Sequence, residues 1–203
     1  MENASREQVL GAATILFAEK GHAGVSLQEI ADAAGVNFSA VSELFTTGEK
    51  LYEAVLETLF SLYVARMDAV FNGNESPSEK IELFTRAMCD IHKKAPYFFP
   101  LFYRELLNPS PFFEPVVKKN IRHVAYLSDN NIARGVQKGE FKRGINPANA
   151  TMILAGLHHY YFLARRLTGS LLPEPANDDE YLTQALEVFL TGLKKGEYKK
   201  DGP

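Results

Sequence analysis

Apolar residues recur at helical spacing from the beginning of the chain. A stripe of four such residues predicts a helix over residues 6–20: Val9, Ala13, Leu16 and Phe17. Gly21 follows directly, in the position where a glycine commonly ends a helix. Ser26 and Glu29 then form a capping-box pattern, in which the serine hydroxyl meets the third amide of the helix and the glutamate reaches back. This pattern predicts a second, short helix with three inward residues: Leu27, Ile30 and Ala31.

A third helix is predicted over residues 38–44, after a tight turn at Gly35. Asn37 is a favourable N-cap for it, and its expected inward face consists of Ala40, Val41 and Leu44. Two short helices joined by a glycine-containing turn are typical of the helix-turn-helix motif. Helices this short bury little surface alone, so we expect a following helix to support them. That helix is predicted over residues 48–70, with Thr47 as its cap and an apolar stripe of Leu51, Val55, Leu59 and Leu62.

A polar segment, residues 72–77, precedes a second region in which helical patterns continue. Five more helices are predicted, over residues 78–94, 97–107, 112–137, 148–168 and 179–196. Prolines fall at or near their ends, where they are tolerated. The expected fold is therefore all-α with about nine helices. It comprises an N-terminal three-helix helix-turn-helix DNA-binding domain, residues 1–47, and a C-terminal helical bundle for ligand binding and dimerisation, residues 48–203, with the helix over 48–70 connecting the two.

The N-terminal segment carries a set of apolar and small residues in one gapless order: Arg6, Ala13, Leu16, Phe17, Gly21, Ser26, Leu27, Ile30, Ala31, Ala34, Gly35, Val36, Phe45 and Leu51 to Val55. This set resembles the N-terminal domain of the TetR/AcrR family of bacterial transcriptional regulators. The resemblance implies a homodimer in which the third helix of each subunit enters the major groove of a palindromic operator on double-stranded DNA. It also implies a small-molecule effector in the second domain that changes the spacing between the two DNA-binding heads.

The resemblance predicts eight DNA-contact residues: Ser26, Asn37, Phe38, Ser39, Ser42, Thr46, Thr47 and Lys50. The family usually has a tyrosine at the position of Ser42, a histidine or similar group at Leu44 and a lysine at Gly48, and the tyrosine and lysine commonly hold phosphates. This chain has none of the three. Lys50 lies two residues past the usual lysine and is a candidate to hold a phosphate instead, while Phe38 is a candidate to contact a thymine methyl group.

Charge argues against strong DNA binding by this segment. The chain has a net charge of −3, and residues 1–50 contain three basic and seven acidic side chains. Binding to duplex DNA draws much of its affinity from neutralised phosphates. Two interpretations therefore stay open: a ligand-responsive regulator with an unusual set of operator contacts, or a dimeric ligand-binding or interaction protein on the same fold that has lost specific DNA binding.

Aromatic residues are concentrated between residues 97 and 113, and a few polar groups accompany them in the second region. Ligand pockets are usually apolar with a small number of polar groups. We expect an effector of unknown identity to contact ten residues: Met88, His92, Phe99, Phe102, Tyr103, Phe113, His123, Tyr126, Asn130 and His159. The alternative is that most of these rings are ordinary core.

The last two predicted helices, over residues 148–168 and 179–196, are apolar over more of their surface than one core face requires. An isologous homodimer through these helices accounts for that excess, and Ala155 and Gly156 would allow close approach. The alternative is that the helices are buried within one subunit.

Other classes of function have little support in the sequence. No nucleophile elbow, phosphate-binding glycine loop or metalloprotease motif is present, so we expect no enzyme. Cys89 and His92 are too few for a zinc site, and we expect neither a metal nor a cofactor. No apolar run is long enough to span a membrane, and the N-terminus lacks the apolar stretch of a signal peptide. The sequence thus predicts a cytoplasmic, ligand-responsive transcriptional repressor that a small molecule releases from its operator.

Overall fold

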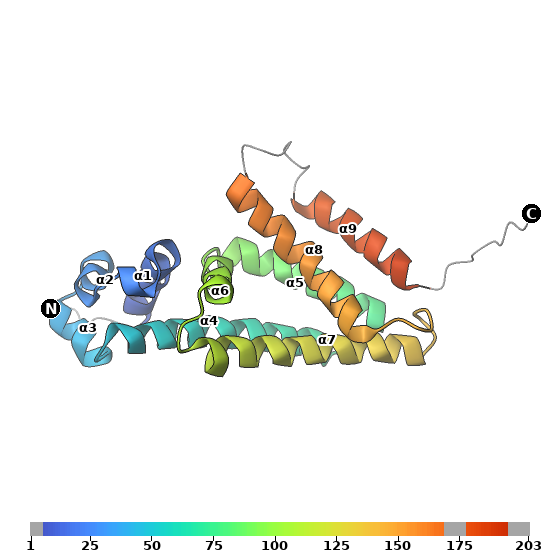
Figure 1. Ribbon diagram of the computed structural model, residues 1–203, viewed down its shortest axis with the longest axis horizontal. Helices are drawn as coiled ribbons and strands as arrows, with labels where there is room; N and C mark the ends of the chain where they lie inside the picture. Colours follow the sequence, from blue (N-terminus) through green and yellow to red (C-terminus); the bar gives the residue numbers. More distant parts are fainter. Residues whose placement is uncertain (1–5, 169–177, 195–203) are drawn as a thin grey trace, which may run out of the picture. The chain divides into compact units, whose positions relative to one another are not determined.

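The computed structural model describes residues 6–168 and 178–194, and nearly all regular structure in these ranges is helical (Figure 1). Nine α-helices are described: α1 Arg6–Lys20, α2 Leu27–Ala34, α3 Phe38–Leu44, α4 Gly48–Phe71, α5 Pro77–Lys94, α6 Phe98–Leu107, α7 Lys119–Gln137, α8 Pro147–Thr168 and α9 Asp178–Leu193. One isolated antiparallel bridge joins Phe141 and Lys194. The predicted all-α fold is therefore confirmed for the part of the chain that the structure describes.

The chain divides into two compact units. The first contains Met1–Ala65 and Ile91–Arg122, and the second contains Arg66–Asp90 and His123–Pro203. Helix α6 therefore belongs to the same unit as α1, α2, α3 and most of α4. The functional assignment of residues 1–47 to DNA binding and of residues 48–203 to ligand binding and dimerisation stays a prediction.

The first unit is built around apolar faces of its short helices. Each of α1, α2 and α3 contributes residues to the core that are fully or almost fully buried: Val9, Ala13, Phe17, Ile30, Ala31 and Val41. Figure 1 shows these helices gathered beside the N-terminal end of α4. Leu51, Tyr52, Val55 and Leu56 of α4 are also buried, so the longer helix supplies the supporting surface that the three short helices need.

Two of the predicted inward residues point elsewhere. Leu44 is 41% exposed because α3 ends there, and the following Phe45 is buried in its place. Leu62 is 67% exposed. The buried face of α4 instead passes through Phe60 and Tyr63, because rings of α6 pack against these two residues. The predicted stripe of α4 was correct over its first two turns and wrong where α6 decides which face is covered.

The segment predicted as one helix over residues 112–137 is divided in the structure. Phe113–Lys118 forms a π-helix, and the regular helix α7 begins at Lys119. Pro115 lies inside the π-helical stretch and has no backbone N–H for a regular helical hydrogen bond. Helix α9 ends at Leu193, and the last two residues of its predicted range lie outside the described residues.

The second unit contains a close packing of backbone and ring. Phe141 is completely buried, and a Cβ atom at Gly135 would overlap its ring. Glycine is therefore required at position 135 to let α7 approach the turn that follows it. No helix in the described ranges is long and apolar enough to cross a bilayer.

Candidate nucleic-acid interface

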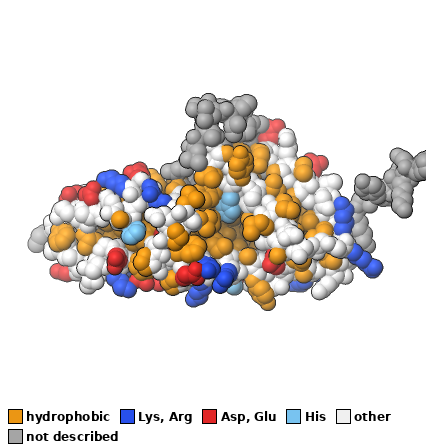
Figure 2. All heavy atoms as spheres, in the orientation of Figure 1, with side chains coloured by type: hydrophobic (Ala, Val, Ile, Leu, Met, Phe, Trp, Pro, Cys, Tyr) orange, Lys and Arg blue, Asp and Glu red, His pale blue; other side chains and the backbone are white. Residues whose placement is uncertain are grey.

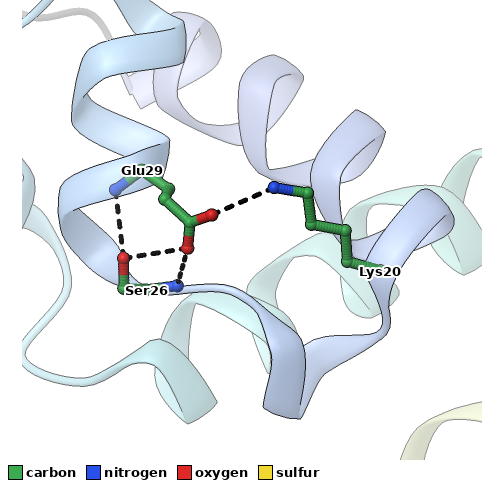
Figure 3. A network of polar contacts seen from close by, with 3 residues as sticks. All are labelled: Lys20, Ser26 and Glu29. Atoms are coloured by element: carbon green, nitrogen blue, oxygen red, sulfur yellow. Dashed lines mark hydrogen bonds and ion pairs between the residues drawn. The ribbon is translucent and has the colours of Figure 1, made fainter.

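The start of α2 is held by a complete capping box (Figure 3). The Glu29 backbone N–H donates to the Ser26 hydroxyl over 3.2 Å, and the Glu29 carboxylate accepts from the Ser26 backbone N–H over 2.9 Å. Lys20, the last residue of α1, donates to the same carboxylate over 3.0 Å. The hydrogen bond from the Ser26 backbone, followed by that from Lys20, lowers the pKa of Glu29 to about 2. The network therefore joins the end of α1 to the beginning of α2.

The turn between α2 and α3 has the left-handed geometry that the glycine predicted. Gly35 has φ 67°, and its N–H donates to carbonyl groups of the last turn of α2. Val41, which is fully buried, anchors α3 from the other side. The position and rotation of α3 are thus fixed by the turn and by one apolar contact. The exposed residues of α3 are available to face a partner: Phe38, Ser39, Glu43 and Leu44.

Six of the eight predicted DNA-contact residues lie exposed along one short stretch of chain: Asn37, Phe38, Ser39, Thr46, Thr47 and Lys50. Ser42 is half-buried and donates its hydroxyl proton to the Ser39 carbonyl over 2.9 Å. Thr47 caps α4, because its hydroxyl accepts from the Lys50 backbone N–H over 3.2 Å. Ser26 stands apart at the start of α2, with its hydroxyl in the capping box. Their contact with DNA stays a prediction.

All three basic side chains between residues 6 and 50 have partners within the protein. Lys20 pairs with Glu29 at 3.0 Å, and Lys50 pairs with Glu53 at 2.7 Å. Arg6 lies over the Phe45 ring, 5.4 Å from its centroid. The i,i+3 spacing of Lys50 and Glu53 is visible in the sequence and could have revealed that pair. Residues 6–50, which we call the head, therefore offer fewer unpaired cations to DNA than their composition alone suggests.

Helix α6 holds the end of α1 through Arg104. The guanidinium group donates to the Ala18 carbonyl over 3.2 Å and to the Glu19 carbonyl over 2.7 Å. A Cβ atom at Gly21 would lie 3.1 Å from the same guanidinium group. Carbonyl groups at the end of a helix lack partners within it, so Arg104 acts as a C-terminal cap supplied from 85 residues away.

The neighbouring residue, Glu105, forms a buried polar cluster with α4. Its carboxylate accepts from the Tyr52 hydroxyl over 2.7 Å and from the Ser110 hydroxyl over 2.9 Å. Burial, followed by the contact with Glu105, raises the pKa of Tyr52 far above its usual range. The His22 ring stacks on the Tyr52 ring at 4.9 Å. This cluster could not be predicted from the sequence, because no pattern along the chain relates positions 52 and 105.

The predicted effector residues are divided between the two units. In the first unit, the His92 ring stacks on Phe99 at 3.7 Å, and Tyr103 lies 6.1 Å from Phe99 and 5.6 Å from Phe102. Phe99 and Phe102 are buried, while Phe113 is half-buried. These rings form one aromatic cluster, apart from Phe113, for which no ring contact with them is described.

In the second unit, the predicted effector residues have dissimilar surroundings. Met88 is fully buried, whereas Tyr126 and Asn130 are exposed. The His123 ring lies 2.8 Å from the Asp68 carboxylate on α4, and both side chains are partly exposed. Burial lowers the pKa of His159 to about 4, so its imidazole is neutral near pH 7. No interaction described in this unit brings these five residues together, and their contact with an effector stays a prediction.

Two surface grooves are described within the second unit. One, of about 660 Å³, lies between α5 and α9, and the other, of about 490 Å³, lies between the start of α8 and the end of α9. Neither is lined by a predicted effector residue. Among the described residues, no three metal-binding side chains lie close enough together to hold an ion.

The helix-turn-helix and the helices that follow it both match known protein families. The family of bacterial regulatory proteins named tetR matches residues 9–55, and the tetracyclin repressor-like C-terminal domain matches residues 77–191. The chain belongs to the TetR family. It is therefore a TetR-family helix-turn-helix transcriptional regulator, and the resemblance drawn from the sequence is confirmed.

Individual relatives cover nearly the whole chain. The HTH-type transcriptional regulator RutR of Escherichia coli strain K12 is 24% identical over 196 residues, which span 95% of this chain and 92% of RutR. A TetR/AcrR-family regulator from Thermobifida fusca is 28% identical with a TM-score of 0.68, covering 94% of this chain and 98% of its own.

A third relative was solved with a ligand. The FadR regulator of Bacillus subtilis, in complex with stearoyl-CoA, has a TM-score of 0.75 at 17% identity, covering 93% of this chain and 99% of its own. At this identity the likeness to FadR concerns the fold alone.

Proposed function

We propose that the chain is a homodimeric repressor that binds a palindromic DNA operator through α3 and leaves it when a small molecule binds the helices that follow α4. The observation that carries this proposal is the presentation of α3. Its buried Val41 and the left-handed Gly35 turn fix the helix, while Asn37, Phe38 and Ser39 remain exposed on its first turn. The N-terminal residues of a recognition helix are those that reach base edges in the major groove.

The proposed dimer uses the outer faces of α8 and α9. Four large apolar residues on these helices are mostly exposed in the single chain: Met152 at 73%, Ile153 at 58%, Tyr160 at 71% and Val188 at 74%. Figure 2 shows hydrophobic side chains at the surface over this part of the molecule. Ile153 and Val188 also line the groove of about 490 Å³. Exposed apolar patches of this kind mark interaction surfaces, and two copies would cover each other symmetrically.

The proposed effector contacts are the ten residues predicted from the sequence, with the aromatic cluster of the first unit as their best-defined part. FadR, which shares the fold, was solved in complex with stearoyl-CoA, and this supports a small-molecule effector for the present chain. Among the ten residues, the two with shifted pKa values are Tyr103 and His159, and both side chains are neutral near pH 7. We propose a binding role in the cytoplasm, with no catalysis.

A second candidate function has one observation in its favour. Because Lys20, Lys50 and Arg6 are all engaged within the protein, the head offers few cations to phosphates. This favours a dimeric ligand-binding or interaction protein without specific DNA binding, because such a protein needs no cations for phosphates.

A footprinting experiment on the DNA that flanks the chain's own gene separates the two functions. The repressor proposal expects one protected region with two symmetric half-sites, and full-length protein should not protect a shuffled duplex of equal length. Uniform or absent protection at low salt would favour the second function.

A further inference from the structure

Asn37 stands at an N-cap position but does not cap its helix. Its backbone has the extended geometry of an N-cap, with φ −70° and ψ 143°, yet its side chain makes no cap hydrogen bond to α3. A capping asparagine typically stabilises a helix by about 1 kcal/mol. The backbone geometry permits the bond, so its absence leaves the Asn37 amide uncommitted.

Polar residues at the N-termini of other helices in the same chain do form side-chain cap hydrogen bonds. The side chains of Ser26, Thr47 and Ser76 each accept a hydrogen bond from the backbone N–H three residues later, at 3.2, 3.2 and 3.3 Å. Asn146, which is also an asparagine, accepts from the Asn149 N–H over 3.1 Å at the start of α8. In contrast to these four residues, Asn37 keeps both its donors and its acceptor for another partner.

Phe38 follows immediately and is 47% exposed. It lies at the first position of α3, while Val41 provides the buried anchor of that helix. The two exposed side chains are thus a free amide and an aromatic ring on adjacent residues. Both lie at the end of the recognition helix that reaches base edges in the proposed complex.

The Asn37 amide and the Phe38 ring both have the chemistry to recognise an A·T base pair. An asparagine amide pairs in a bidentate way with N6 and N7 of adenine, and apolar side chains contact the methyl group of thymine. The commonest contact to guanine is made by arginine or lysine, and α3 contains neither residue. A serine hydroxyl can pair with either kind of base, so Ser39 and Ser42 favour neither base pair.

We infer that Asn37 and Phe38 are the specificity-determining residues of this head and that they read an A·T step, Asn37 through the adenine N6/N7 edge and Phe38 through a thymine methyl group. The inference rests on the proposed function, since it requires the operator complex. It goes beyond that function by naming the bases that each side chain recognises.

Selection of duplexes from a random library by the full-length protein tests both claims. The selected half-site should contain an invariant A·T step at the place protected by α3. In that duplex, deoxyuridine replaces the thymidine, which removes only the methyl group, and 7-deazadeoxyadenosine replaces the deoxyadenosine, which removes only N7. Wild-type protein should bind the first analogue about fourfold more weakly and the second about two- to tenfold more weakly.

Two variants assign the effects to residues. Phe38→Ala should bind the thymidine and deoxyuridine duplexes equally well, while still discriminating against 7-deazadeoxyadenosine. Asn37→Ser keeps a good N-cap residue and should lose only the discrimination against 7-deazadeoxyadenosine. Circular dichroism of both variants checks that the helices are retained.

The outcomes that overturn the inference differ from those that overturn the proposed function. An enriched half-site with G·C pairs at these positions, or wild-type affinity that neither analogue changes, contradicts the assignment of Asn37 and Phe38 but leaves the repressor intact. Failure to enrich any sequence contradicts the proposed function itself, and the base assignment fails with it.

Discussion

Tyr52 on α4 donates a 2.7 Å hydrogen bond to the carboxylate of Glu105 on α6. Both residues are about 1% exposed, so the carboxylate depends on protein donors instead of water. The next residue toward the N-terminus, Arg104, holds the last carbonyl groups of α1. One turn of α6 therefore fastens two separate helices of the unit that carries the helix-turn-helix.

Removal of the Tyr52 hydroxyl should destabilise this unit. Tyr52→Phe keeps the ring but leaves one buried Glu105 oxygen without its donor, which costs about 1–3 kcal/mol of unfolding free energy. Chemical denaturation followed by circular dichroism measures the change. Tyr63→Phe is the matched control on the same helix, since its hydroxyl has no described partner, and an equal loss in both variants would contradict the role of the Glu105 contact.

Loss of the Arg104 side chain should loosen the end of α1. Arg104→Ala leaves the Ala18 and Glu19 carbonyl groups without their donor, and hydrogen exchange should become at least several-fold faster in the last turn of α1. Mass spectrometry of exchanged peptides measures this effect. Arg122→Ala, which removes an exposed arginine of the same unit, should leave exchange in α1 unchanged. Similar exchange rates in both variants would contradict the role of Arg104 as a cap of α1.

Release of Lys50 from its ion pair should strengthen DNA binding. In Glu53→Gln the 2.7 Å partner of Lys50 loses its charge, so the ammonium group becomes available to a phosphate. The slope of log affinity against log salt should steepen by about one. Glu7→Gln removes an exposed carboxylate from the first turn of α1 and controls for net charge. If both variants change the slope equally, Lys50 holds no phosphate.

A charge in the proposed dimer face should separate the subunits. Val188→Asp places a carboxylate in a side-chain position that is 74% exposed in the single chain, so folding is spared while apolar burial between copies is lost. Light scattering after size-exclusion chromatography should then report a monomer. Leu62→Asp, at an exposed apolar residue of α4, is the control and should remain dimeric. A Val188→Asp variant that is still dimeric would contradict the proposed interface on α8 and α9.

Local patterns in the sequence predicted the helices of the head well. Glycines at positions 21 and 35 and the Ser26–Glu29 box act on residues within one or two turns of themselves, so their spacing carries the information. Leu62 was placed wrongly because the covered face of α4 depends on rings of α6 that lie far away in sequence. The spacing of residues within α4 cannot predict such packing.

The candidate site was predictable to a different degree. The segment from Asn37 to Lys50 followed from the family resemblance, and its exposure agrees with a binding surface. The sequence does not show which side chains form cap hydrogen bonds. Asn37 and Asn146 both stand directly before a helix, yet only the Asn146 side chain caps its helix. The Tyr52–Glu105 contact spans 53 positions and required the fold.

The proposed repressor binds a specific DNA operator although the basic side chains of residues 6–50 are engaged within the protein. A fluorescence anisotropy titration of the full-length chain against DNA flanking its own gene, at about 50 and 200 mM salt, tests it most directly. We expect saturable binding that a shuffled duplex does not reproduce, with a shallow dependence of the affinity on salt. Absence of saturable binding at the lower salt concentration would contradict it.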